Sequence, residues 1–170
     1  MKPRLFIITG AMAAGKSTVA QLLAESLPKS VHLRGDVFRR MIVTGRAEMG
    51  PVLSEEALSQ LALRHRLAGD VARAYHDAGF TVVYQDILIG AALSQAAERL
   101  ADLDPTIIVL NPGAETLARR GAGRSKPGYS DGFPPNILAN ALERETPRLG
   151  LWLDTSQMTA EEVVERILRS

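Results

Sequence analysis

The residues best suited to chemistry lie near the N-terminus, where Gly10, Gly15, Lys16 and Ser17 fill the pattern G-x-x-x-x-G-K-[ST]. The glycines let the backbone turn so that successive N–H groups point at phosphate oxygens, and a helix beginning near Lys16 adds its positive dipole end. Lys16 is expected to reach the β- and γ-phosphates of a nucleoside triphosphate, and the Ser17 hydroxyl to ligate Mg²⁺. The pattern therefore predicts a phosphate-binding loop. Its predicted nucleotide-binding residues are Gly10, Ala11, Met12, Ala13, Ala14, Gly15, Lys16, Ser17 and Thr18.

A carboxylate follows the second apolar run of the chain, in the sequence Arg34-Gly35-Asp36. Ligands of open α/β sheets bind outside the carboxyl ends of the strands, so Asp36 is the leading catalytic candidate. It could accept the proton of an attacking substrate hydroxyl or help to hold Mg²⁺, and the alternative is that it caps the next helix. The nearby Arg34, Arg39 and Arg40 are predicted to bind an anionic or hydroxylated substrate, with plain charged surface as the alternative for Arg39 and Arg40.

A second acid ends the apolar run 81–85. Asp86 is expected to bind Mg²⁺ through water or to contact the substrate, and Gln85 beside it to contact the substrate. The alternative for Asp86 is a carboxylate that caps the following turn. The sequence does not divide the work between Asp36 and Asp86.

A basic, glycine-rich arm over residues about 119–133 carries Arg120 and Arg124. Such an arm can fold over a nucleotide, exclude water and neutralise charge on the transferring phosphoryl group, and the alternative is an ordinary solvated loop. Thr155 and Ser156, in the turn after the last predicted strand, are expected near the nucleotide base, mainly through backbone contacts. Residues about 36–53, with two glycines and a proline near their end, are expected to form the wall that binds the acceptor.

Short apolar runs alternate with amphipathic helical stretches, which is typical of a parallel sheet covered by helices on both faces. The predicted strands are roughly 4–9, 31–34, 81–85, 106–110 and 150–154. A long helix is expected between an N-cap at Ser54 and Gly79, and a capping box at Thr159 predicts a closing helix. The expected buried face of the long helix is Leu58, Leu61, Ala68, Val71, Ala72 and Tyr75.

Length and composition fit one α/β domain over residues 1–170. Twenty Lys and Arg against nineteen Asp and Glu give a formal charge of +1, which argues against a nucleic-acid partner. The chain has no cysteine, which excludes disulfides and thiolate metal sites, and its three histidines show no ligand spacing. It has neither a signal-peptide pattern nor an apolar run long enough to span a membrane, so we expect a cytoplasmic monomer or homodimer.

With these pieces placed, the chain resembles the small P-loop kinases of the chloramphenicol phosphotransferase-like and zeta-toxin-like group, and more distantly gluconate and shikimate kinases. The resemblance rests on the glycine-rich loop, the strand-end acids, the arginine-bearing arm and the closing Leu153-Asp154-Thr155-Ser156 before a Glu-rich helix. It implies the P-loop NTPase fold, a three-layer αβα sandwich around a five-stranded parallel sheet of order 2-3-1-4-5, with a small lid. It also implies the catalytic set Lys16, Asp36, Arg120 and Arg124, with Asp36 as the base and the two arginines in the lid.

The resulting expectation is a kinase that uses ATP and Mg²⁺ and moves the γ-phosphoryl group to a hydroxyl of a small molecule, such as an antibiotic, a sugar or a nucleotide sugar. No sequence signature marks a particular acceptor. Two alternatives stay open: a nucleotide or polynucleotide-end kinase, and a nucleotide-dependent binding module that acts as a switch.

Overall fold

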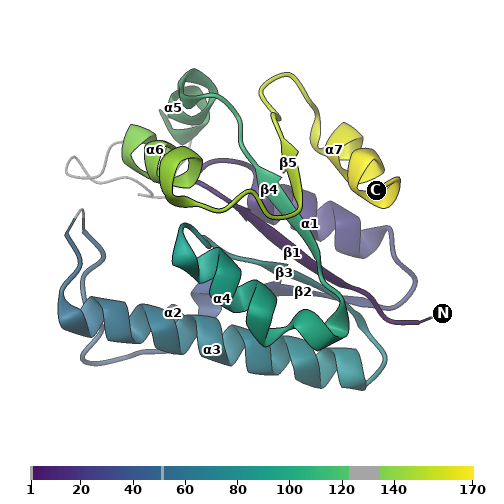
Figure 1. The fold of residues 1–170 in the computed structure, drawn as a ribbon, viewed down its shortest axis with the longest axis horizontal. Helices are drawn as coiled ribbons and strands as arrows, with labels where there is room; N and C mark the ends of the chain where they lie inside the picture. The colour runs from purple at the N-terminus through teal and green to yellow at the C-terminus, as the bar shows by residue number, and fades with distance from the viewer. Residues whose placement is uncertain (1, 51, 123–134) are drawn as a thin grey trace.

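The computed structural model describes residues 2–50, 52–122 and 135–170, and its centre is one parallel sheet (Figure 1). The strands are β1 (Leu5–Gly10), β2 (Ser30–Arg34), β3 (Thr81–Gln85), β4 (Thr106–Leu110) and β5 (Leu151–Leu153). They pair in parallel in the order β2-β3-β1-β4-β5, which confirms the predicted fold and strand order. The strands differ from the predicted ranges by two residues at most, because buried parallel strands appear in the sequence as short continuous apolar runs.

The helices begin and end at signals that are visible in the sequence. Their bounds are α1 (Lys16–Glu25), α2 (Asp36–Arg40), α3 (Glu55–Asp77), α4 (Ala91–Arg99), α5 (Ala114–Ala122), α6 (Pro135–Glu145) and α7 (Ala160–Leu168), with a short 3₁₀ turn at Ala101–Leu103. The Ser54 hydroxyl accepts the N–H of Ala57 at 3.1 Å and caps α3. Thr159 and Glu162 form the predicted capping box at the start of α7.

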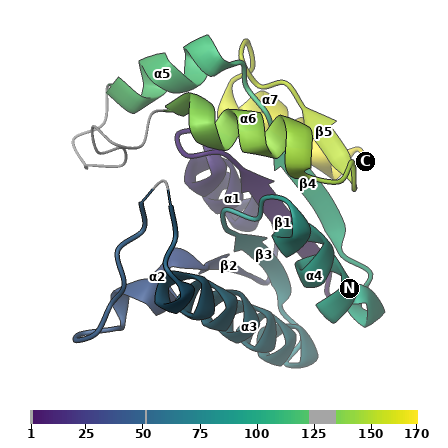
Figure 2. The ribbon, with the colours of Figure 1, turned by 60° about the vertical axis from the view of Figure 1, so that its left-hand side comes forward.

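Helices cover both faces of the sheet (Figure 1, Figure 2), and each face carries a separate hydrophobic core. Successive side chains of a strand point to opposite faces, so Phe6 and Ile8 of β1 pack against α1 and α7, whereas Leu5 and Ile7 pack against α3 and α4. The predicted inner face of α3 is wrong in part, because Leu58 and Tyr75 are exposed. Small residues make the contact instead, since the buried residues of α3 are Ala57, Ala68, Gly69 and Ala72.

This topology positions the site. Because β1, β2 and β3 are adjacent and parallel, the loop after β1, the Gly35–Asp36 turn after β2 and Asp86 after β3 meet at one edge of the sheet. The buried Thr9 hydroxyl fixes that edge further, since it donates to the Leu88 carbonyl at 3.0 Å and accepts the Leu88 N–H at 2.9 Å. Among the described residues, no helix is both long and apolar enough to cross a membrane.

Candidate active site

The loop between β1 and α1 has the backbone geometry of an anion-binding cradle. Ala13 and Gly15 both have positive φ, 66° and 92°, whereas Ala14 between them does not. A backbone that alternates in the sign of φ turns neighbouring N–H groups toward one point. Helix α1 starts at Lys16 with no acidic residue in its first turn, so its dipole faces that point without competition. The Lys16 ammonium lies across the loop and donates to the Ala11 carbonyl at 2.7 Å.

Two cavities flank this loop, and both are lined by Ala13 and Gly15. The first, of about 240 Å³, lies on the β2–β3 side, and we call it the acceptor-side cavity. The second, of about 280 Å³, lies toward α5 and α7, and we call it the nucleotide-side cavity. The acceptor-side cavity is lined by Met12, Ala13, Gly15, Lys16, Ser17, Arg34, Asp36, Arg40, Arg64, Gln85, Asp86 and Ile87. A ligand that enters one cavity and binds the loop would therefore face the other cavity.

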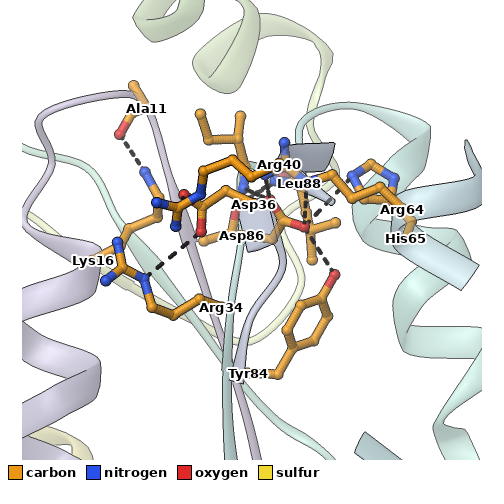
Figure 3. A network of polar contacts seen from close by, with 12 residues as sticks. Ala11, Lys16, Arg34, Asp36, Arg40, Arg64, His65, Tyr84, Asp86 and Leu88 are labelled. Carbon is orange, nitrogen blue, oxygen red and sulfur yellow. Dashed lines mark hydrogen bonds and ion pairs between the residues drawn. The ribbon is translucent and has the colours of Figure 1, made fainter. Parts of the chain in front are cut away.

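Asp36 lies in the wall of the acceptor-side cavity, between two arginines (Figure 3). Its carboxylate is 2.9 Å from the Arg40 Nη2 atom and 3.7 Å from the Arg34 Nε atom. Gly35, and not Asp36, is the N-cap of α2, so the structure does not support the helix-capping alternative. The carboxylate is partly exposed and is available to a molecule in the cavity.

Asp86 is buried, and its carboxylate is hydrogen-bonded on all sides by the chain itself (Figure 3). Arg64 of α3 donates to both of its oxygens, through Nε at 3.1 Å and through Nη2. The Tyr84 hydroxyl donates at 3.3 Å and the Ile87 N–H at 2.8 Å. The bond from Ile87 corresponds to the turn-capping alternative for Asp86, and the paired guanidinium of Arg64 adds a partner that no motif indicates.

The surroundings of Asp86 change the proton affinity of its neighbours. Burial and the Asp86 carboxylate raise the pKa of the Tyr84 hydroxyl well above its usual value, so this group stays a donor. Burial lowers the pKa of His65, whose Nε2 atom lies 4.0 Å from Asp86, and this outweighs the attraction of the carboxylate. His65 is therefore neutral near pH 7, and the charge partner of Asp86 is Arg64.

The other residues predicted to contact substrate separate into two groups. Arg34, Arg40 and Gln85 line the acceptor-side cavity. Arg39 does not, because its guanidinium turns away and donates to the Ala47 carbonyl at 2.9 Å. Gln60 of α3 also accepts the Ala47 N–H and donates to the Gly45 carbonyl, so the segment after α2 is tied to α3.

The nucleotide-side cavity contains the predicted residues Thr18, Arg120 and Thr155. Arg120 of α5 donates to the Thr155 carbonyl at 3.0 Å, and its guanidinium lies beside Gly15. The Thr155 hydroxyl is buried and makes no hydrogen bond to any described residue. Arg124 and most of the predicted lid arm, residues 123–133, lie outside the described residues.

Ser156 is close to this cavity but has a structural task. Its hydroxyl donates to Asp154 at 2.6 Å and accepts the Gly113 N–H at 2.8 Å, which joins the turns after β4 and β5. The hydrogen bonds from Ser156 lower the pKa of Asp154. Contacts from this turn to a nucleotide would therefore come from Thr155 rather than from the Ser156 side chain.

Arg64 is the residue of the site that the sequence motifs missed. It lies in the middle of a long helix, where an arginine usually faces solvent. The signal that indicates it is its spacing, because Ala57, Leu61, Arg64, Ala68 and Ala72 recur at helical intervals on the inner face of α3. A charged residue on a buried stripe requires a buried partner.

The sheet order and the glycine-rich loop define the P-loop NTPase fold. A family model described as an AAA domain matches residues 5–162, and the chain belongs to that family. No curated protein matches the chain significantly in sequence.

Solved structures of other proteins share this fold over nearly the whole chain. A gluconokinase from Sinorhizobium meliloti 1021 is 20% identical with a TM-score of 0.66, and the match covers 99% of this chain and 91% of the other. The APS kinase of Mycobacterium tuberculosis, in complex with AMPPNP and APS, is 19% identical with a TM-score of 0.70 over 99% of both chains. The tunicamycin resistance protein of Deinococcus radiodurans is 20% identical with a TM-score of 0.69 over 98% of this chain and 94% of the other. At these identities the likeness shows the fold.

Proposed function

We propose that this protein is a phosphotransferase that moves the γ-phosphoryl group of ATP, with Mg²⁺, to a hydroxyl of a small molecule. The observation that carries the proposal is the pair of cavities that share the Ala13–Gly15 wall of the loop. A nucleotide that occupies one cavity and lays its phosphates on the loop presents its terminal phosphate to the other. The second cavity contains a carboxylate, which a module that only binds nucleotide does not need.

The proposed chemistry on the acceptor side uses Asp36 as the base. Its carboxylate accepts the proton of the acceptor hydroxyl while that oxygen forms a bond to the γ-phosphorus, and the bond between the γ-phosphorus and the bridging oxygen breaks to release ADP. Arg34 and Arg40, which pair with Asp36, hold its carboxylate in the cavity wall. Lys16 and the loop N–H groups neutralise charge on the transferring group.

The residues present fit a magnesium ion held mostly by phosphates and water. Ser17 is in the first turn of α1 and lines the same cavity as Asp36, and hydroxyl and carboxylate oxygens suit Mg²⁺. Among the described residues no group of three His, Asp or Glu side chains gathers, which matches an ion with few protein ligands. When bound, the ion would neutralise charge on the β- and γ-phosphate oxygens. Ser17 is the proposed ligand, and Asp36 is the alternative ligand if it does not act as the base. Asp86 is reassigned because its oxygens already accept four hydrogen bonds.

On the nucleotide side, the Thr155 hydroxyl is proposed to contact the base or ribose, and Arg120, whose guanidinium lies beside Gly15, to neutralise charge on the phosphates. The Thr155 hydroxyl is buried without a partner among the described residues, and a bound nucleotide would supply one. The predicted lid arginine Arg124, the acceptor wall at residues 36–53, a single domain over 1–170 and a monomeric or dimeric state stay part of the proposal. So does the narrower resemblance to the chloramphenicol phosphotransferase-like and zeta-toxin-like group.

The comparisons support this function without naming the acceptor. Two of the similar structures are kinases, a gluconokinase and an APS kinase, and the second holds AMPPNP together with APS. That kinase, which matches this chain over 99% of both lengths, holds AMPPNP and APS together. We propose the same arrangement of a nucleotide and an acceptor for the two cavities of this chain.

The test is a mass-shift screen with ATP and Mg²⁺ against pooled hydroxylated antibiotics, sugars, nucleosides, nucleotide sugars and short oligonucleotides. We expect phosphate on a small-molecule acceptor, and an Asp36→Asn variant with kcat lower by about 10²- to 10⁴-fold, the usual contribution of a general base. Asp104→Asn is the matched control, since Asp104 is exposed at the opposite end of the sheet and asparagine tolerates its φ of 50°.

Each result of the screen has a distinct meaning. Equal turnover by Asp36→Asn and the parent would remove the base assignment. Transfer to oligonucleotides alone would favour a polynucleotide-end kinase. Tight ATP binding with no acceptor-dependent ADP in any pool would replace the kinase by a nucleotide-dependent switch.

A further inference from the structure

Arg64 is the part of the acceptor-side cavity that the proposed chemistry does not use. Its side chain is 13% exposed, and that of its partner Asp86 is fully buried. Arg64 nevertheless lines the cavity beside Lys16 and Asp36, on the side formed by α3. A nearly buried arginine at the wall of a ligand-sized cavity is a candidate for binding an anion.

The hydrogen bonds of Arg64 to the described residues use only one side of its guanidinium. Nε and Nη2 donate to Asp86, and no hydrogen bond to a described residue uses Nη1. The carboxylate in turn is held by Tyr84 and by the Ile87 N–H, so Asp86 has little freedom to turn. Asp86 and Tyr84 therefore act as positioning residues that fix the plane of the guanidinium.

A purely structural role for the Arg64–Asp86 ion pair does not explain its position. Burying two charges costs several kcal/mol of desolvation, and such pairs are often no more stabilising than apolar residues of the same volume. If the pair served only to attach α3 to β3, nothing would require it to lie at the carboxyl end of β3, facing the phosphate-binding loop. Its position is the one that a ligand in the cavity would contact.

The charges of the cavity point the same way. Apart from Lys16, which serves the phosphates, the cavity is lined by three arginines, Arg34, Arg40 and Arg64, and by two carboxylates, Asp36 and Asp86. Arg64 and Asp86 balance each other, so the excess positive charge lies on Arg34 and Arg40 around Asp36, and an acceptor with one acidic group would offset it.

We infer that Arg64 binds an anionic group of the acceptor, and that the acceptor class is hydroxylated small molecules that carry a carboxylate or a phosphate. This inference rests on the proposed function, because it concerns the acceptor of that reaction. It assigns the hydroxyl to Asp36 and the acidic group to Arg64, so the two contacts together orient the acceptor.

The test measures binding first, so that it does not depend on turnover. Matched acid and neutral compounds, glycerate with glycerol, gluconate with sorbitol, and ribose 5-phosphate with ribose, are titrated calorimetrically into the protein saturated with AMPPNP and Mg²⁺. We expect the acidic member of at least one pair to bind about 10- to 100-fold more tightly than its neutral partner, as for a charged hydrogen-bonded contact. The carboxylate and phosphate arms show which acidic group is preferred.

The variants are chosen so that no charge is left buried alone. In Arg64→Gln with Asp86→Asn, the two amides can still bond to each other, and we expect the preference for the acidic member to disappear while AMPPNP affinity is kept. Arg64→Lys keeps the charge but not the fork of donors, and we expect it to restore part of the preference. Arg66→Gln, two residues along α3 and exposed, is the matched control and should bind as the parent does.

The outcomes separate this inference from the proposed function. Equal or better binding of every neutral partner, or a preference that survives in the double variant, would overturn the role of Arg64. A preference that depends on Arg64, with no phosphate transferred to any tested compound, would retain the anion site and count against the kinase. Transfer to neutral acceptors alone would retain the kinase and overturn the anion site.

Discussion

Replacing Gly35 by alanine should destabilise the turn between β2 and α2, because the new methyl group has no room. An ideal Cβ at Gly35 would lie 1.8 Å from the Asp86 Oδ2 atom and 2.4 Å from its Cγ atom, against an ordinary contact distance of 3.4 Å or more. Either the turn moves by roughly 1.6 Å or the carboxylate leaves Arg64.

Both responses cost free energy of unfolding. Overpacking of a fitted site costs about 1–3 kcal/mol, and breaking a buried ion pair costs about 3–5 kcal/mol. Alanine returns about 0.4–1 kcal/mol by restricting the unfolded chain. The cheaper response governs, so we expect Gly35→Ala to lower the free energy of unfolding by about 1–2 kcal/mol, measured by urea denaturation with circular dichroism.

A control variant and a second genetic background test the reasoning behind Gly35→Ala. Gly113→Ala is the control, since its Cβ would meet only the Ser156 hydroxyl at 3.6 Å, and its cost should stay within about 0.5 kcal/mol. In an Asp86→Ala background most of the clash is gone, so Gly35→Ala should cost at least about 1 kcal/mol less than in the parent. A Gly35→Ala variant as stable as the parent, or an equal cost in both backgrounds, would refute this account of the turn.

Three further perturbations follow from contacts of the described residues. Thr159→Ala removes the capping box of α7 and should lower the free energy of unfolding by about 1 kcal/mol in urea titrations, whereas Thr159→Ser should restore it. Burial, and then Arg34, lower the pKa of His32 below its ordinary 6.5, so the unfolded chain binds more protons. The contribution of His32 ionisation to the free energy of unfolding is therefore nil above pH 6.5 and becomes destabilising as the pH falls below that value. His32→Gln should reduce this loss of stability at low pH. An unchanged dependence of the free energy of unfolding on pH would contradict the assignment. Arg120→Ala should raise the Kd for ATP about 10-fold in calorimetry, with the exposed Arg144→Ala as the control that should not.

The elements of this fold could be predicted because their signals are local. Each strand is a short apolar run, and the helices α3 and α7 start at side-chain caps that are visible within four residues of sequence. The glycine-rich loop is equally local, since its backbone conformation depends on its own glycines. The strand order came from resemblance, and the structure confirms it.

The acceptor side was harder to predict because its geometry depends on contacts between distant parts of the chain. Asp86 looks like a free strand-end acid until Arg64, 22 residues earlier, is placed on it. Arg39 and Arg40 are equivalent in sequence, yet one faces the segment after α2 and the other faces Asp36. The inner face of α3 was partly misjudged because its contact uses alanine and glycine, while the larger Leu58 is exposed.

The way the two cavities are divided along the chain has a consequence for evolution. Among the described residues beyond the loop and α1, those that line the acceptor-side cavity fall between Arg34 and Ile87, and those that line the nucleotide-side cavity fall between Arg120 and Val163. The first stretch includes β2 and β3, which form one outer side of the sheet next to β1. If the proposed function holds, recombination or drift within that single contiguous segment can change which acceptor is used, while the proposed nucleotide-binding half is inherited intact.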